Sequence, residues 1–115
     1  MNKKLELALS SIGIPYYNTR ATGTDNECAI YQISEDEYSY CDDDEDIIEY
    51  KILIVLFLKG KLNKRIKTLK ANLLKNGFII DSIPYPNIEG KNGETLISQS
   101  IVCKYKDFSD LNTNT

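Results

Sequence analysis

The chain has 115 residues, three cysteines and no histidine, and its 14 basic and 17 acidic residues give a formal net charge of −3 at pH 7. This length is typical of one domain around a single hydrophobic core. The net charge argues against a protein that holds nucleic acid by its phosphates, and the lack of histidine removes the commonest general base and transition-metal ligand.

Cysteine usage and the amino end indicate where the protein is made. Cys28, Cys41 and Cys103 are odd in number and show no CxxC spacing, which argues against a disulfide framework and a zinc cluster. Glu6 comes before any long apolar stretch, so a secretory signal is not expected. The apolar run 52–58 is too short to cross a bilayer. We expect a soluble protein that is made in the cytoplasm, with no membrane partner.

A short amphipathic helix is predicted over residues 3–11, where apolar side chains recur at helical spacing (Leu5, Ala8, Leu9 and Ile12). Gly13 and Pro15 end it. Residues 16–28, rich in Asn, Thr and Gly, predict a loop, and residues 29–34 predict the first strand.

A long hairpin with an acidic tip is predicted next. Residues 38–41 and 47–58 predict its two strands, and residues 42–46 predict the turn between them. The segment from Glu35 to Glu49 holds nine carboxylates and no Lys or Arg. The candidate acidic interface residues are those of the tip: Asp42, Asp43, Asp44, Glu45 and Asp46.

A basic helix follows over residues 61–76. Its apolar stripe has spacings of four, three and four residues (Leu62, Ile66, Leu69 and Leu73), and Gly77 is expected at its carboxyl end. The segment from Lys59 to Lys75 holds seven basic residues and no acid. The candidate basic interface residues are Lys61, Lys64, Arg65, Lys67 and Lys70. These residues could instead bind a phosphate backbone or form a solvated helix face.

Residues 78–83 predict a strand, 84–93 a turn, and 95–106 the last strand. The polar tail 107–115 is expected to be frayed, which leaves one domain over residues 1–106. The predicted class is α+β, with a mostly antiparallel sheet of four to five strands packed on two helices.

Catalytic and metal-binding chemistry is not expected. No Gly-rich phosphate loop precedes a helix. The register of Asp42, Asp44 and Asp46 in an EF-hand loop would place Ile47 and Leu53 where glycine and glutamate are required. Loose divalent-ion association with the acidic run stays open as an alternative to a solvated turn. We therefore assign no catalytic, cofactor or metal residue and expect no enzyme activity.

The strand 47–58 is apolar on both faces from Ile52 onward, which indicates that both faces need cover. Two short helices can cover one face of the sheet. The other face, with Leu53, Val55 and Phe57, is to be covered either by the first helix and the loop 16–28 or by a neighbouring subunit. The oppositely charged segments beside this strand favour head-to-tail assembly.

The chain resembles the tail terminator (tail completion) proteins of long-tailed bacteriophages and prophages. Successive segments carry the resemblance: Gly13-Ile14-Pro15, Ala29-Ile30-Tyr31, Tyr40-Cys41-Asp42-Asp43-Asp44, Ile48-Glu49-Tyr50-Lys51-Ile52-Leu53, Leu74-Lys75-Asn76-Gly77-Phe78, and the last strand from Gln99 to Tyr105. Residues 16–26 and the tail from Asp107 depart from the family pattern.

The resemblance implies an α+β structural protein without a cofactor. It implies a hexameric ring at the head-proximal end of the tail tube, which stops tube growth and joins the tail to the head. The implied partners are other copies of the chain, the tail tube protein and the head–tail connector protein, and the implied final location is the tail or neck of the virion.

Two functions are compatible with the acidic segment. In a ring, copies of Asp42–Asp46 could line the channel and keep DNA from adsorbing, so that DNA passes without specific binding. The alternative is a small acidic inhibitor that mimics nucleic acid, with the segment from Glu35 to Glu49 in place of phosphates.

Overall fold

The structure is a computed structural model that describes residues 2–18, 27–38, 47–91 and 93–108. Two helices and six strands follow one another along the chain. They are α1 (Asn2–Ser10), β1 (Tyr16–Asn18), β2 (Cys28–Tyr38), β3 (Ile47–Leu58), α2 (Leu62–Lys75), β4 (Ile79–Ser82), β5 (Asn87–Lys91) and β6 (Glu94–Phe108).

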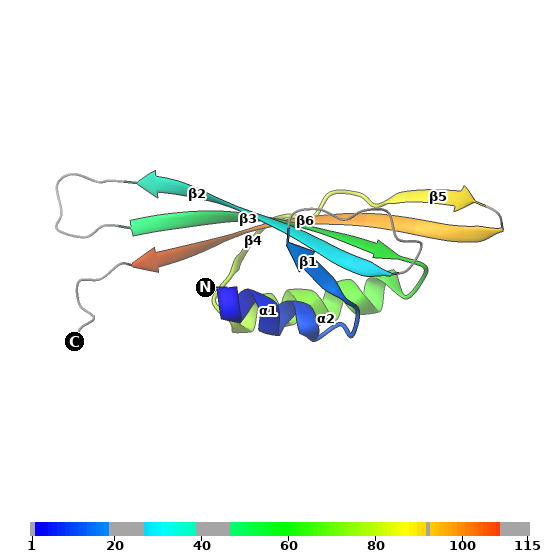
Figure 1. The fold of residues 1–115 in the computed structure, drawn as a ribbon, viewed down its shortest axis with the longest axis horizontal. Helices are drawn as coiled ribbons and strands as arrows, with labels where there is room; N and C mark the ends of the chain where they lie inside the picture. Colours follow the sequence, from blue (N-terminus) through cyan, green and yellow to red (C-terminus); the bar gives the residue numbers. More distant parts are fainter. Residues whose placement is uncertain (1, 19–26, 39–46, 92, 109–115) are drawn as a thin grey trace.

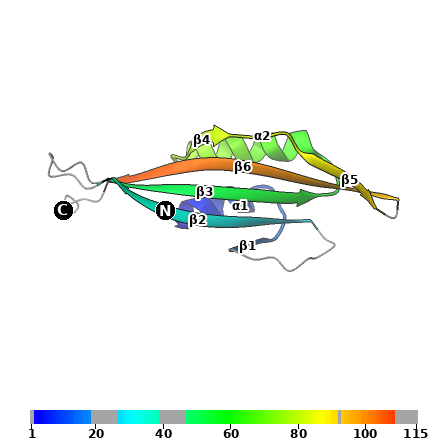
Figure 2. The same cartoon turned by 90° about the horizontal axis from the view of Figure 1, so that it is seen from above.

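All six strands belong to one sheet with the order β1-β2-β3-β6-β4, and β5 pairs with β6 beside β4 (Figures 1 and 2). The short pair of β1 and β2 is parallel, and the other pairs are antiparallel. The registers of β2 with β3 and of β3 with β6 run without a shift. The predicted α+β class with a mostly antiparallel sheet is therefore confirmed.

Both helices pack on the same face of the sheet (Figure 1). Alternate residues of β3 point to this face and are buried in the core: Ile52, Ile54, Leu56 and Leu58. They pack with Leu9 of α1 and with Leu69 and Leu73 of α2. Because side chains alternate along a strand, Leu53, Val55 and Phe57 point to the opposite face. The alternative that the first helix and the loop 16–28 cover this opposite face is wrong for the helix, and residues 19–26 of the loop lie outside the described residues.

The predicted helices form because their apolar stripes match the helical period. α2 ends in a Schellman motif, in which the Phe78 amide donates to the Leu73 carbonyl at 2.9 Å and the Gly77 amide donates to the Leu74 carbonyl at 3.1 Å. Gly77 has φ of 91°, a conformation that glycine adopts without a Cβ clash. Phe78 follows directly into the core, so the end of α2 is fixed by both backbone and side-chain contacts.

Four strand assignments differ from the sequence prediction. β2 is one strand from Cys28 to Tyr38 and includes the acidic residues 35–37, because β3 supplies a cross-strand partner for every residue of it. Tyr16–Asn18, predicted as loop, forms β1, and Asn87–Lys91, predicted as turn, forms β5. β6 continues to Phe108. The predicted turn at 42–46 lies outside the described residues.

The molecule is long and narrow, with extents of 57 × 23 × 21 Å. The sheet runs past the helices at both ends (Figure 1). At one end β2, β3 and β6 project, and at the other end the β5–β6 hairpin projects. The helices therefore cover only the middle of the sheet.

The helix-covered core predicts a large difference between two leucines of α2. Leu69 is fully buried and Leu74 is 53% exposed. We expect Leu69→Ala to lower the free energy of unfolding by about 2–5 kcal/mol. Leu74→Ala should change it by less than about 0.5 kcal/mol. Urea denaturation followed by circular dichroism measures both, and equal effects would contradict this packing.

Candidate functional site

The predicted apolar interface residues lie on the face of the sheet opposite the helices. Leu53 and Phe57 are each 37% exposed, and Val55 between them is partly buried. Among the residues that the structure describes, no helix or further strand covers this row. The central strand therefore presents apolar side chains to solvent in the isolated chain.

Neighbouring strands widen this row into a patch. Val55 lies opposite Ile30 of β2, and Leu53 lies opposite Val102 of β6. We call the set Ile30, Leu53, Val55, Phe57 and Val102 the open-face patch. Polar residues occupy other positions opposite the row (Gln32, Ser98 and Ser100). An apolar patch with a polar surround is typical of an interaction surface.

A shallow hollow adjoins the open-face patch. Leu53 and Val102 contribute to its lining, together with polar residues (Asn18, Gln32, Ser34 and Lys51). Amide, hydroxyl and ammonium groups can hydrogen-bond to the backbone or side chains of a partner. The hollow thus combines apolar and polar lining groups.

The predicted basic residues of α2 divide into two groups. Lys61, Lys64, Lys67 and Lys70 are exposed. Arg65 is only partly exposed, and its Nη1 lies 2.8 Å from Oε1 of Glu27. The four lysines can therefore meet a partner, whereas Arg65 is engaged in an ion pair within the fold.

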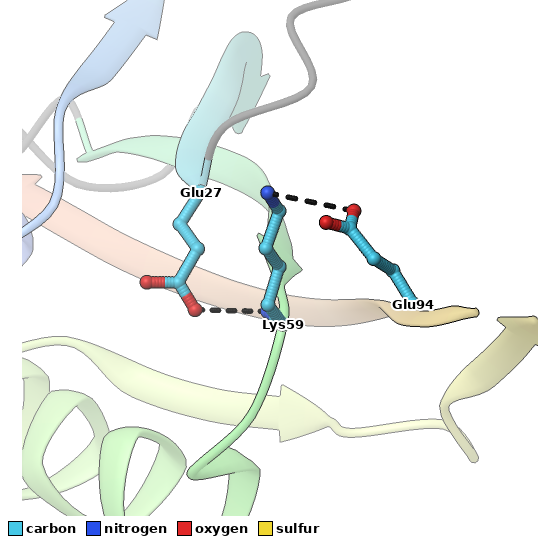
Figure 3. A network of polar contacts seen from close by, with 3 residues as sticks. All are labelled: Glu27, Lys59 and Glu94. Carbon is cyan, nitrogen blue, oxygen red and sulfur yellow. Dashed lines mark hydrogen bonds and ion pairs between the residues drawn. The ribbon is translucent and has the colours of Figure 1, made fainter. Parts of the chain in front are cut away.

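Glu27 joins three parts of the chain. Besides its ion pair with Arg65, its carboxylate accepts a hydrogen bond from the backbone amide of Lys59 at 2.8 Å (Figure 3). Lys59 Nζ in turn lies 3.8 Å from Oε2 of Glu94. These contacts hold the link between β3 and α2 to Glu27, which directly precedes β2. The role of these contacts is therefore structural.

The pKa of Glu27 reflects these contacts. Burial acts to raise the pKa of the carboxyl, but the hydrogen bond from Lys59 and the hydrogen bond and charge of Arg65 lower it more, together with the charge of Lys59. The result is a pKa below the ordinary value of 4.5. The carboxylate is therefore held in its ionised form at neutral pH.

The sequence did not indicate a groove between α2 and the segment before β5. Lys67 and Lys70 of α2 line one side, and Pro84 and Tyr85 line the other. Tyr85 is 98% exposed, and the buried Gln99 donates to the Pro84 carbonyl at 2.6 Å. Two elements that are distant in the sequence form the groove, so helical or strand periodicity gives no signal for it.

Two cysteines lie among the described residues. Cys28 and Cys103 are buried and form no disulfide, and burial raises the pKa of the Cys103 thiol to about 12. A thiol with such a pKa is a poor nucleophile at neutral pH. In the described part of the chain, no three Cys, Asp or Glu residues gather as metal ligands. Within the same residues, neither helix is long and apolar enough to span a membrane.

The predicted interface groups lie on different surfaces. The open-face patch and the lysines of α2 are on opposite sides of the sheet (Figure 1). The acidic residues Asp42–Asp46 lie outside the described residues, and so does Cys41. The structure therefore does not bring the basic and apolar groups into one site.

Comparison with known proteins gives distant structural matches, among them two solved chains that align along nearly their whole length. No family model matches the chain, and no curated protein matches its sequence. One solved chain, from the virion of a native gene transfer agent particle, aligns with 94% of this chain and 91% of its own length, at 9% identity and a TM-score of 0.48. A second solved chain aligns with 96% of this chain and 98% of its own length, at 9% identity and a TM-score of 0.41. Matches at this level do not carry a role over to this chain.

The contacts of Glu27 predict a pH-dependent contribution to stability. Because the pKa of Glu27 is lowered in the folded state, its stabilisation is present above the unfolded-state pKa and is lost as pH falls through the folded-state pKa. We expect Glu27→Gln to lower the free energy of unfolding by about 1 kcal/mol at pH 7. The difference from the wild-type chain should shrink below about pH 4.

Glu94→Gln is the matched control, since within the described residues the contact that the structure shows for Glu94 is the long, exposed ion pair with Lys59. Its effect at pH 7 should be below about 0.5 kcal/mol. Urea denaturation of the three proteins across pH measures these differences. A Glu27→Gln difference that does not vary with pH would contradict the assigned role of the carboxylate.

Proposed function

We propose that this protein is a structural component of a phage tail or a related particle, and that it assembles into a ring at the head-proximal end of the tail tube. There it would stop tube growth and join the tail to the head. The single observation that carries the assembly is the open-face patch on the central strand. The resemblance of the sequence to tail terminator proteins supports the finer assignment.

Assembly would remove the open-face patch from water. Burying apolar surface contributes roughly 25 cal/mol per Å². Leu53, Val55 and Phe57 are already held in a row by the β3 ladder with β2 and β6, so little order is lost when a partner covers them. A rigid apolar row of this kind suits a permanent contact in an assembled particle.

Charge would orient the copies. The exposed lysines of α2 give one surface a positive charge, and the segment from Glu35 to Glu49 carries nine carboxylates. Exposed ion pairs each contribute only about 0.2–1 kcal/mol, so they favour one orientation while apolar burial supplies most of the attraction. Opposite charges at different surfaces favour a head-to-tail arrangement, which can close into a ring.

The partners in this proposal are other copies of the chain, the tail tube protein and the head–tail connector protein. DNA would pass the ring without specific binding, in keeping with the net charge of −3. The proposed role requires no cofactor and no catalytic step. Its final location is the tail or neck of the virion.

Negative-stain microscopy of the purified protein, with light scattering for its mass, tests the proposal. We expect annular particles, and we expect the protein to bind the ends of assembled tail tubes. A monomer mass at all concentrations, without binding to tube ends, would overturn the proposed function. Competition with DNA for a nucleic-acid enzyme would favour the acidic mimic instead.

The open-face patch predicts that one charge on it disrupts assembly. We expect Leu53→Asp to weaken self-association by at least about tenfold, because the new carboxylate would lose its hydration on burial. The control is Leu7→Asp on α1, which alters a leucine that is 61% exposed on the helix side of the sheet. Sedimentation equilibrium measures both, and equal association constants would contradict a role for the patch.

Ionic orientation predicts a dependence on salt. Raising sodium chloride from about 0.05 M to about 0.5 M should weaken assembly, because screening reduces the attraction between exposed charges. The Lys64→Glu, Lys67→Glu double variant should assemble more weakly than the wild-type chain at low salt and lose most of this dependence. An association constant that rises steadily with salt in the wild-type chain would contradict ionic orientation.

A further inference from the structure

One end of the sheet has two strand edges that no described strand covers. β2, β3 and β6 project there past the helices (Figure 1). On the outer side of β2, β1 pairs only with residues 29–31, so the edge from Gln32 to Tyr38 is open within the described residues. On the outer side of β6, β4 pairing stops at Lys104, so the edge from Tyr105 to Phe108 is likewise open.

The register shows which backbone groups face outward along β2. The Ala29 amide donates to the Pro15 carbonyl at 2.8 Å, so Ala29 directs its backbone groups away from β3. In an antiparallel ladder, alternate residues direct their N–H and C=O groups to the same side. Because the register with β3 has no shift, Ile33, Glu35 and Glu37 also direct their backbone groups to the open edge.

The same alternation extends across the sheet to β6. Leu56, opposite Ala29, directs its backbone groups toward Gln99 of β6. Gln99 in turn directs its backbone groups toward β3. Because the direction alternates along β6 and the register has no shift, Lys106 and Phe108 direct their backbone groups away from β3. In the described part of the chain, both open edges therefore present unpaired backbone donors and acceptors. Such groups can pair with a strand of another chain.

The charges of the two edges are opposite. Among the residues whose side chains the structure describes, the exposed Glu35 lies on the open edge of β2 and the exposed Lys106 lies on the open edge of β6. Two β2 edges would bring like charges together, which disfavours a symmetric pair. A β2 edge beside a β6 edge brings opposite charges together, so the charges select a head-to-tail contact.

We propose that the outer edge of β2 in one copy pairs with the outer edge of β6 in the next copy, so that the sheet continues from one protomer to the next. β2 and β6 are both antiparallel to β3, so they are parallel to each other. Copies related by rotation about an axis along the strands would keep this parallel direction, and each copy offers one edge of each kind. The inference rests on the proposed ring and adds a strand-edge contact to it. The open-face patch lies on a face of the sheet, so its burial is a separate contact.

Proline at an outward-facing position tests the contact, because it removes an edge donor and leaves the ladder inside the protomer intact. We expect Glu35→Pro and Lys106→Pro each to lower the association constant at least about tenfold, with a circular dichroism spectrum like that of the wild-type chain. Ser34→Pro is the control for the register, since the Ser34 amide faces β3 and its loss should lower the thermal midpoint of the monomer.

Mixing the two edge variants tests the head-to-tail geometry. Glu35→Pro keeps a working β6 edge and Lys106→Pro keeps a working β2 edge, so an equimolar mixture should form a one-to-one dimer and nothing larger. If Lys106→Pro alone assembles like the wild-type chain, β2 edges pair with each other and the inference is overturned. It is also overturned if both variants assemble normally.

Hydrogen exchange of the wild-type chain provides a test that needs no variant. On passing from dilute monomer to assembly, the amides of Glu35 and Lys106 should gain protection, while that of Lys91 at the opposite end should not. Assembly without protection at Glu35 and Lys106 would overturn the edge contact and leave the proposed ring standing. A wild-type chain that never associates would overturn the proposed function itself.

Discussion

The structure depends on a mismatch in length between its strands and its helices. A helix rises about 1.5 Å per residue and a strand about 3.3 Å. The 14 residues of α2 therefore extend about 21 Å, whereas the 15 residues of β6 extend about 50 Å. The helices therefore cannot shelter the whole length of the sheet, and its two projecting ends follow from this shortfall. The opposite face is uncovered within the described residues because both helices lie on the same face.

The helix layer is nevertheless held firmly to the middle of the sheet. Leu69 and Leu73 anchor α2 in the core, the Schellman motif fixes its end, and Arg65 binds Glu27 near its start. These contacts make the covered face a packed structural unit. The surfaces left for partners are then the open-face patch, the exposed lysines and the strand edges.

The sequence predicted the elements whose patterns are strong and local. The apolar stripes of α1 and α2 and the alternation of β3 mark those elements, and the alternation also assigned Leu53, Val55 and Phe57 to one face. β1 and β5 were missed because three and five residues carry little pattern, and a neighbouring strand decides their conformation. Which face α1 covers was left open, since an amphipathic helix suits either face of a sheet that is apolar on both.

The continuous pairing of β3 with β6 has a mechanical consequence. Twelve residue pairs join these strands in one unshifted register, from Ile47 with Phe108 to Leu58 with Ile97. Hydrogen bonds in an antiparallel ladder are perpendicular to the strands. Tension that draws β3 and β6 in opposite directions along their length loads all of these bonds in shear at once instead of opening them one after another. The long ladder thus makes the molecule stiff along the direction of its strands.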